Sequence, residues 1–487
     1  MKTIDLNLKA LDSLENKDVP KYKLTDCKTQ ILHIGVGNFH RSHQAYYLHK
    51  LMQQNDTGWR ICGAGLMPQD LKMKEALQKQ DYLYTLDAQE LESEEVTVIG
   101  TIRDFIHIST EMQRFIDKFT SDDLRIVSLT VTEKGYCNTT DWKLDVTNER
   151  VIHDLNKTDE APITAVGVLA KGLKARMQVN ARPITIMSCD NIPENGMVLK
   201  NVLLKFVELT GDLELIDYIN KSIVFPCCMV DRITPITTPE KKEYLATKYG
   251  INDNFPVFSE KFIQWVVEDN FNVERPEWEK VGAQIVDDVR PYELMKTRLL
   301  NGGHTSLSFP SLLSGFVFVD DAMRDPKIKK FVNSYMDEVK QTLNPIEGVD
   351  YDEYINELIV RFANPATKDR ILRLAEDTSS KFLNFIINPL MILLNKGEKV
   401  PMITMVLASW IVYLAKAHTN SEYEVKDPLG SKLKKIAHES LTDVKPFLSV
   451  KEIFPKEILE NKEFIDNLNS TIKSVLDDGP MQVLDRL

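Results

Sequence analysis

The segment from Glu293 to His304 holds an acid, a base, an amide and an imidazole within one short stretch. On an α-helix that rotates about 100° per residue, Asn301 lies about 140° and His304 about 80° from Lys296. We therefore expect these side chains, with Glu293 in the same arc, to project from one broad side of a helix. The alternative is an ordinary polar helix face with His304 capping or hydrogen-bonded in the core.

Such a set suits the oxidation of a secondary alcohol. The hydroxyl proton needs a base within hydrogen-bond reach, and Lys296 is the candidate. An ordinary lysine pKa of about 10.4 makes a poor base, so burial or a neighbouring cation has to lower it. The amides of Asn191 and Asn301 can donate hydrogen bonds to a developing alkoxide, and His304 can orient a hydroxyl. This chemistry requires no metal.

Two consecutive glycines, Gly302 and Gly303, lie inside the same segment. Glycine costs helix stability. We therefore expect the pair to mark a place where another backbone or a ligand comes close.

The first half of the chain alternates short β-rich runs with helical patterns, which predicts a parallel sheet with crossover helices. Ligands bind such sheets beyond the carboxyl ends of the strands, so the polar residues there, Glu133 and Cys189 to Asn191, are candidates for function. The predicted strands are Gln30–Ile34, Trp59–Gly63, Ile126–Thr132 and Ile184–Ser188, and the predicted helices are His43–Gln54 and Leu71–Lys79.

From about Tyr292 onward the patterns become long and helical. The fold class is therefore α/β, and we infer an N-terminal α/β domain (1–289) followed by a mainly helical C-terminal domain (290–487), with the active site between them. The predicted helices are Tyr292–Leu300, Pro326–Leu343, Tyr351–Phe362, Lys368–Glu376, Met402–Ala417 and Glu463–Leu476.

The first predicted strand leads into Gly35-Val36-Gly37, followed by Asn38, Phe39 and His40. A dinucleotide fold needs glycines there for a tight turn and for close approach of the pyrophosphate, which the next helix receives at its N-terminus. The third glycine of the usual pattern is replaced by His40. Arg41 adds a cation near the phosphates, or it is a solvated residue at the helix start.

The second strand runs toward Asp70, the nearest carboxylate able to bind a ribose hydroxyl. Asp70 could instead cap the helix that follows. No arginine stands there for a 2′-phosphate, although Lys72 and Lys74 are close. NAD is favoured over NADP.

The composition excludes several classes of protein. The 487 residues are 43% hydrophobic and 27% charged, with a net charge of -12 and no basic patch, so we expect no nucleic-acid partner. The apolar stretch Val400–Ala415 is shorter than the ~20 residues of a membrane span, which favours a buried core helix. The N-terminus lacks the apolar core of a secretory signal, and the six cysteines have no repeated spacing, so a cytoplasmic protein with reduced thiols is expected.

Without a heptad pattern, we expect a monomer or a weak homo-oligomer. His40, His43 and Cys62 lack the spacing of zinc ligands, so no metal site is expected.

Five ordered blocks, covering almost the whole chain, resemble the polyol-specific long-chain dehydrogenases and reductases. The resemblance implies a Rossmann-type domain with a helical substrate domain and reversible oxidation of D-mannitol to D-fructose with NAD. The blocks are Gly35–Ala45, Ser128–Tyr136, Ser188–Asn191, Met229–Pro235 and Tyr292–His304.

The resemblance also assigns roles to single residues. Lys296 becomes the catalytic base, Asn191 and Asn301 bind the oxyanion, His304 orients the substrate, and Glu293 gates proton exchange with solvent. The implied cofactor contacts are Gly35, Gly37, Asn38, Phe39, His40, Arg41, Asp70, Thr132 and Asp231.

Two departures from the family pattern concern the choice of polyol. Pro226-Cys227-Cys228 replaces the common Pro-Asn-Ser, and Asn384 stands where relatives often carry a lysine. Lys381, one turn earlier, is a substitute. Arg361 and Arg373 are further candidates for substrate hydroxyls, with surface ion pairs as the alternative for each.

Other reactions on this scaffold stay open. They are reduction of fructuronate or tagaturonate, and oxidation of arabinitol or mannitol 1-phosphate. An acidic substrate should bring an additional Arg or Lys to the pocket, and no added cluster is visible. A nicotinamide-binding sensor without catalysis is the alternative from another class, although a sensor has no need for Lys296.

Overall fold

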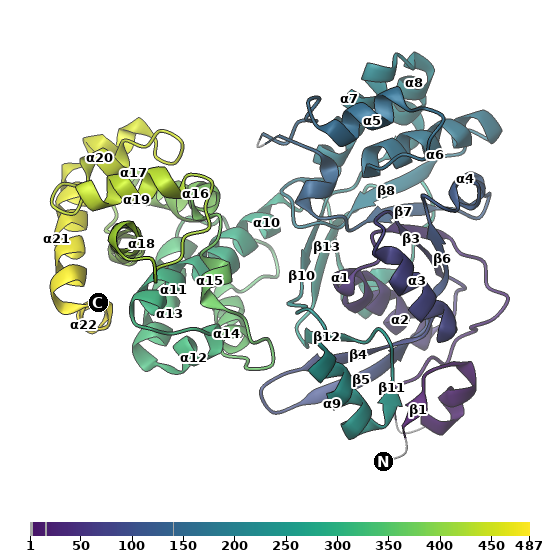
Figure 1. Ribbon diagram of the computed structural model, residues 1–487, viewed down its shortest axis with the longest axis horizontal. Helices are drawn as coiled ribbons and strands as arrows, with labels where there is room; N and C mark the ends of the chain where they lie inside the picture. The colour runs from purple at the N-terminus through teal and green to yellow at the C-terminus, as the bar shows by residue number, and fades with distance from the viewer. Residues whose placement is uncertain (1–2, 15–16, 140) are drawn as a thin grey trace. The chain divides into compact units, whose positions relative to one another are not determined.

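The computed structural model describes residues 3–14, 17–139 and 141–487. The chain folds into two compact units, Met1–Arg290 and Pro291–Leu487, whereas the sequence placed the division between residues 289 and 290. The first unit contains the sheets and the second consists of helices (Figure 1). The expected fold class is confirmed.

The first unit is built on a six-stranded sheet in which all neighbouring strands run parallel. Numbered within this sheet, the order is 3-2-1-4-5-6, as in dinucleotide-binding folds. The order reverses between β2 and β7, and ligands bind beyond the carboxyl ends of strands at such a point. In spatial order the strands are β6 (Ile102–His107), β3 (Ile61–Gly65), β2 (Ile31–Ile34), β7 (Ile126–Leu129), β8 (Ile184–Ser188) and β9 (Ile223–Val224).

The sequence predicted β2, β3, β7 and β8, and did not identify β6 and β9. Strand β7 ends at Leu129, earlier than expected. Pairing of Ile34 with Leu129 and of Leu129 with Ser188 makes β2, β7 and β8 end level with one another. Side chains in the three turns that follow therefore start from one edge of the sheet.

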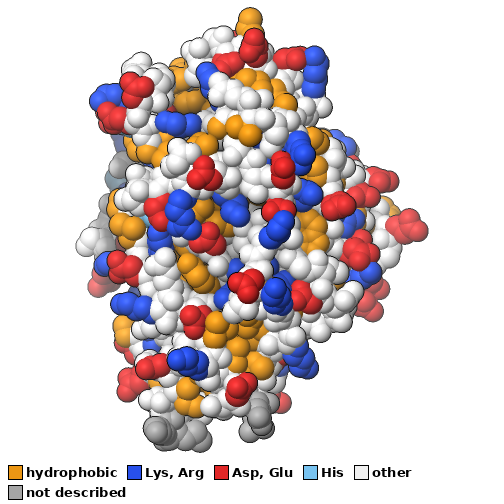
Figure 2. Space-filling model, turned by 90° about the vertical axis from the view of Figure 1, so that its right-hand side faces the viewer, with side chains coloured by type: hydrophobic (Ala, Val, Ile, Leu, Met, Phe, Trp, Pro, Cys, Tyr) orange, Lys and Arg blue, Asp and Glu red, His pale blue; other side chains and the backbone are white. Residues whose placement is uncertain are grey.

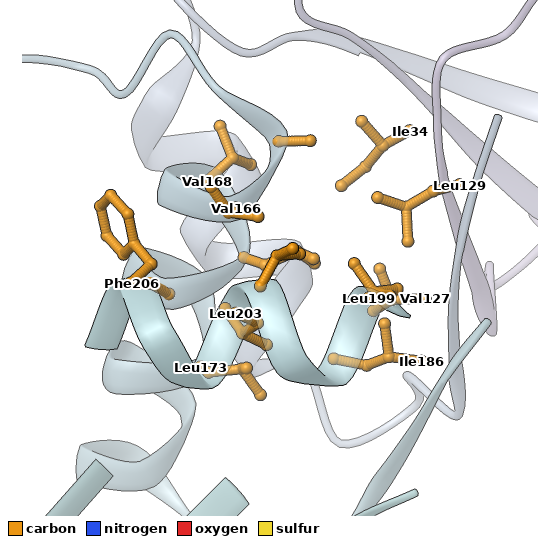
Figure 3. Close-up of a cluster of buried hydrophobic side chains, with 14 of the residues drawn as sticks. Ile34, Val127, Leu129, Val166, Val168, Leu173, Ile186, Leu199, Leu203 and Phe206 are labelled. Atoms are coloured by element: carbon orange, nitrogen blue, oxygen red, sulfur yellow. The ribbon is translucent and has the colours of Figure 1, made fainter. Parts of the chain in front are cut away.

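An apolar core fixes this edge from one face of the sheet (Figure 3). Strand side chains pack there against α6 (Ala165–Val179) and α7 (Asn195–Thr210). Full burial of one such aliphatic side chain is worth about 1.5–3 kcal/mol, so the strand ends are held firmly. The packed residues include Ile34, Val127, Leu129 and Ile186 from the strands, and Val166, Val168, Leu173, Leu199, Leu203 and Phe206 from the helices.

A second core cluster includes residues of α2 (Gln44–Gln54) together with Trp265 and Trp278, whose ring centroids are 4.7 Å apart. The other helical segments of the unit are α1 (Asn38–Ser42), α3 (Asp70–Lys79), α4 (Met112–Thr120), α5 (Glu149–Asn156), α8 (Leu213–Ser222), α9 (Pro239–Tyr249) and the 3₁₀ turns Leu8–Leu14, Glu133–Tyr136 and Trp278–Val281.

Three small sheets complete the unit, and the sequence did not predict them. Several of their strands pair with partners far away in the chain, such as β1 with β11 and β4 with β12, and no local pattern marks those pairings. Strands β4 and β5 instead form a local antiparallel hairpin, which the sequence reading missed. They are β12-β4-β5 (Val257–Glu260, Tyr84–Gln89, Glu94–Ile99), β10-β13-β14 (Cys228–Asp231, Gln264–Glu268, Gln284–Val286) and β1-β11 (Ile4–Asp5, Ile251–Asn252).

The second unit is organised around α18 (Pro401–Thr419), which packs against α11, α19 and α21. This helix is long and apolar enough to cross a membrane, but 83% of its most apolar window is buried inside the protein, as expected for a core helix. The other helices are α10 (Arg290–Lys296), α11 (Gly302–Leu313), α12 (Val319–Arg324), α13 (Pro326–Lys340), α14 (Tyr351–Phe362), α15 (Ile371–Leu374), α16 (Thr378–Phe382), α17 (Asn388–Asn395), α19 (Gly430–Glu439), α20 (Lys445–Leu448), α21 (Lys462–Asp478), α22 (Pro480–Leu484) and the 3₁₀ turn Lys456–Glu460.

Two π-helical turns interrupt this unit, Thr297–Asn301 between α10 and α11 and Leu383–Ile387 between α16 and α17. The first of them corrects the prediction of one α-helix over Tyr292–Leu300. Because i→i+5 bonding holds more residues in each turn, the ideal α-helical angles do not apply across the first π turn.

The helix predicted over Lys368–Glu376 is reduced to α15. Residues before it pair with another segment instead: Phe318 and Arg370 form an isolated bridge, and Val319 N–H donates to the Asp369 carbonyl.

Candidate active site

The turn after β2 has two glycines with different surroundings. Gly35 has φ +91°, and a Cβ there would lie 2.2 Å from the carbonyl oxygen of Thr130. At Gly37 the nearest atom to an added Cβ is the Gly35 oxygen, 3.9 Å away. Gly35 therefore allows close packing of the turn against the end of β7, and Gly37 leaves open space at the point where the strand order reverses.

A short helix, α1, follows this turn and precedes the helix that the sequence predicted. Asn38, Phe39, His40 and Arg41 lie in α1, which is separated from α2 by His43 with φ -115° and ψ -90°. The helix predicted from His43 therefore begins at Gln44.

Arg41 is fully buried, which rules out a solvated residue at the helix start. Its guanidinium donates to Asn38 Oδ1 at 2.8 Å and to the Phe255 carbonyl. These bonds brace α1, and a contact with phosphate stays a prediction.

His40 is also buried and stacks on His33, with ring centroids 3.4 Å apart. Burial lowers the pKa of both imidazoles, that of His33 to about 3, so both rings are neutral near pH 7. His40 lines a small cavity with Gln44 and Trp265. A contact between His40 and a cofactor stays a prediction.

Asp70 is the first residue of α3 and is half-buried beside the end of β3. Its Oδ2 accepts a hydrogen bond from Met67 N–H at 2.8 Å. A Cβ on Gly65 would lie 2.5 Å from the Asp70 Cβ, so the carboxylate is held close to the strand end. This is the region where dinucleotide folds hold a ribose.

The turns after β7 and β8 are joined by Asp190, which the sequence placed in the candidate segment Cys189 to Asn191 without assigning it a role. Its carboxylate accepts hydrogen bonds from Val131 N–H (3.1 Å), Thr132 N–H (2.8 Å) and the Tyr136 hydroxyl (2.7 Å). Asn191 follows it directly and is exposed. The sequence feature that could have pointed to the role of Asp190 is an acidic residue next to Asn191, directly after a buried strand.

Strand β10 ends at Asp231, which is buried. Its first residue is tied to the end of β8, because Cys228 Sγ lies 3.1 Å from the Ser188 carbonyl oxygen. Cys227 and Cys228, the departures from the family pattern, are both buried.

In the second unit, the predicted catalytic residues lie along one continuous helical segment. Lys296 is the last residue of α10 and is 8% exposed, and Glu293 precedes it on the same helix. Asn301 closes the π turn. The His304 ring stacks on Phe362 of α14, with centroids 3.9 Å apart and planes 18° apart.

The two glycines after Asn301 do permit a close approach, but by side chains rather than by the backbone or ligand that the sequence predicted. A Cβ on Gly302 would lie 2.7 Å from the Tyr335 hydroxyl, and one on Gly303 would lie 2.4 Å from the Met336 methyl carbon. The neighbour is therefore α13.

The three predicted substrate residues differ in their surroundings. Arg361 is buried in α14. Lys381 is half-buried, and its Nζ donates to the Leu374 carbonyl at 3.2 Å. Arg373 is exposed and forms an ion pair with Asp369, which is the surface alternative that the sequence allowed. Substrate contact by these three side chains stays a prediction.

Among residues 3–14, 17–139 and 141–487, no group of three or more His, Cys, Asp or Glu side chains is arranged to hold a metal ion. His43 Nε2 bonds to the Gln264 carbonyl at 2.9 Å, and Cys62 Sγ lies 3.7 Å from Asp104 Oδ2. Two of the three side chains considered as zinc ligands, His43 and Cys62, therefore have other partners.

Family models match most of the chain. The mannitol dehydrogenase Rossmann domain covers residues 29–280, and the mannitol dehydrogenase C-terminal domain covers residues 288–476. The chain belongs to the mannitol dehydrogenase family.

Curated relatives have similar lengths. A mannitol dehydrogenase of Saccharomyces cerevisiae is 38% identical over 98% of this chain and 96% of its own. A mannitol 2-dehydrogenase of Phaeosphaeria nodorum is 37% identical over 98% of this chain and 84% of its own.

Two solved structures also align over nearly the whole chain. The Pseudomonas fluorescens mannitol 2-dehydrogenase ternary complex with NAD and D-mannitol has a TM-score of 0.84 and 38% identity over 99% of both chains. A D-sorbitol dehydrogenase in substrate-free form has a TM-score of 0.91 and 31% identity over 98% of this chain and 100% of its own.

Proposed function

We propose that this protein is an NAD-dependent polyol dehydrogenase that oxidises D-mannitol to D-fructose with Lys296 as general base. The supporting observation from the structure is the lysine buried at the junction between α10 and the first π turn, with Asn301 and His304 following on the same helical segment. Family membership and the mannitol 2-dehydrogenase complex with NAD and D-mannitol support the choice of substrate and cofactor.

The first unit fits a dinucleotide at the point where the strand order reverses. Gly37 leaves open space beside the turn, and the Asp70 carboxylate lies near the end of β3, where it can accept hydrogen bonds from a ribose diol. NAD, when bound, supplies the hydride acceptor for the carbon that is oxidised.

Lys296, as the free amine, takes the proton of the substrate hydroxyl and becomes an ammonium. A lysine base needs surroundings that disfavour the ammonium form, and burial is one such influence. Glu293, one turn earlier on α10, then passes the proton to solvent, which returns Lys296 to its basic form.

Asn191 and Asn301 donate hydrogen bonds from their amides to the substrate oxygen as it acquires negative charge. Removing one such donor typically costs about 10²–10³-fold in kcat. His304, whose ring is fixed by stacking on Phe362, orients a neighbouring hydroxyl.

The base assignment is tested by comparing Lys296→Ala with Lys396→Ala, an exposed lysine on the same unit. We expect Lys296→Ala to lose at least about 10²-fold in kcat while its NADH affinity is unchanged. Small primary amines added to the buffer should restore part of the rate of Lys296→Ala. If Lys296→Ala keeps most of the wild-type rate, Lys296 is not the base.

D-Sorbitol is a second candidate substrate, because a D-sorbitol dehydrogenase aligns with a TM-score of 0.91. A panel of mannitol, sorbitol, arabinitol, mannitol 1-phosphate and mannonate, each with NAD and with NADP, separates the candidates. Mannitol with NAD should give the highest kcat/KM. Cofactor binding without turnover of any of these compounds would instead indicate a sensor.

A further inference from the structure

The turn between β7 and Tyr136 contains an unusual backbone conformation. Thr132 has φ 64° and ψ 165°, a region that residues with a Cβ rarely adopt. Such conformations cost about 1–3 kcal/mol and persist only where the surroundings hold them. The question is which group holds this one.

Asp190 is that group. Both of its carboxylate oxygens are used: Oδ1 accepts from Thr132 N–H, and Oδ2 accepts from Val131 N–H and the Tyr136 hydroxyl. Asp190 is buried, so these three protein donors, rather than bulk water, solvate its carboxylate. Burial and the nearby charge of Glu133 raise the carboxyl pKa, while the three donors favour the anion.

The backbone of Asp190 is anchored as well. Asn195 Nδ2 donates to the Asp190 carbonyl at 3.0 Å and to the Cys228 carbonyl at 2.8 Å, and Asn195 Oδ1 accepts from Cys228 N–H at 3.0 Å. The residue that precedes Asn191 is therefore fixed through its side chain to the turn after β7 and through its carbonyl to Asn195, which is itself bonded to β10.

We propose that Asp190 is a positioning residue, which holds the Thr132 turn for the cofactor and sets the direction of Asn191 toward the substrate oxygen. This inference rests on the proposed function of Asn191 and Thr132. Asp190 itself does not touch the reacting atoms.

A matched control exists in the same unit. Asp154 is buried to a similar degree, 8% against 7% exposed, and its carboxylate also accepts two backbone N–H groups, from Ile163 and Thr164, and the Thr164 hydroxyl. These bonds hold the start of α6, on a segment that contains no predicted site residue.

The test compares Asp190→Asn with Asp154→Asn. Both lose an acceptor facing backbone donors, so both should lower the melting temperature by similar amounts. Only Asp190→Asn should speed amide exchange at Val131 and Thr132, weaken NADH binding about tenfold and lower kcat by about 10²-fold, the scale of a small misplacement in an active site. Tyr136→Phe, which removes one of the three donors, should give an intermediate loss.

The outcomes separate the two proposals. Equal kinetic losses in the two aspartate variants, or an unchanged kcat and NADH affinity in Asp190→Asn, would overturn the role of Asp190. A wild-type enzyme that binds NADH but oxidises none of the polyols would contradict the proposed function alone, because the differences in amide exchange and NADH affinity between the variants would persist.

Discussion

At the scale of single residues, the two glycines of the nucleotide turn illustrate how one motif serves two needs. Gly35 packs against the Thr130 carbonyl with a positive φ, whereas the space around Gly37 is open. The first is required by the fold, and the second is required only when a ligand occupies the space.

Gly35→Ala should therefore affect mainly stability, and Gly37→Ala should affect mainly cofactor binding. Gly35→Ala should cost more than about 2 kcal/mol of stability, because the backbone is strained and the added Cβ overlaps a carbonyl oxygen. Gly37→Ala should fold within about 0.5 kcal/mol of wild type but bind NADH at least tenfold more weakly. Thermal unfolding and NADH titration measure the two effects. Normal NADH affinity in Gly37→Ala would remove the pyrophosphate from this turn.

At the scale of elements, the two π turns are linked by one side chain. The Tyr335 hydroxyl donates to the Phe385 carbonyl of the second π turn at 3.2 Å, and it lies where a Cβ on Gly302 would come within 2.7 Å. Tyr335 is fully buried on α13. The Tyr335 side chain therefore contacts both the residue after the first π turn and the second π turn, which contains Asn384.

Gly302→Ala should displace this contact and lower kcat, because Asn301 and His304 flank the altered residue. Adding Tyr335→Phe removes the clashing oxygen and leaves ring carbons at 3.3 and 3.4 Å, so the double variant should regain part of the lost activity. Tyr413→Phe removes a comparable hydroxyl bond, to the Glu424 carbonyl, and should rescue nothing. Equal activity of the single and double variants would refute the coupling.

These elements also show where sequence reasoning stops. Apolar patterns predicted β8 and α14 with the bounds that the structure has, because β8 is a continuous buried run of apolar and β-branched residues and α14 buries one regular helical face. A π turn of five residues leaves too short a pattern to distinguish from an α-helix. The role of Asp190 depends on the juxtaposition of two distant strand ends, and local spacing does not encode that juxtaposition.

At the scale of the whole molecule, charge and burial determine how stability depends on pH. Acidic and basic side chains are interspersed on the face shown in Figure 2. Buried groups have opposing effects. Burial lowers the pKa of His33 to about 3. The unfolded chain therefore binds a proton that the folded protein does not, and the free energy of unfolding increases as pH rises toward 6.5. Burial raises the pKa of Asp87 to about 6, so its contribution falls as pH rises.

Glu338 in the second unit is the residue best suited to measure how a buried acid makes stability depend on pH. Its carboxylate accepts Met402 N–H at 3.0 Å and Ile403 N–H at 2.9 Å in the first turn of α18, and burial raises its pKa to about 7. Because this folded-state pKa lies above the unfolded value of about 4.5, the stabilising contribution is complete below pH 4.5 and is lost as pH rises through 7.

Glu338→Gln removes the titrating group and keeps one acceptor for the two N–H donors. Relative to wild type, the variant should therefore gain stability between pH 5 and pH 8, by up to about 3 kcal/mol for a shift of this size. Unfolding by denaturant at pH 5, 6, 7 and 8 gives the difference directly, and the effects of the histidines and Asp87 cancel because both proteins contain them. The exposed Glu398→Gln serves as control and should show no trend. A pH-independent difference for Glu338→Gln would mean that the carboxyl titrates alike in the folded and unfolded chains, and that the bonds to α18 offset its burial.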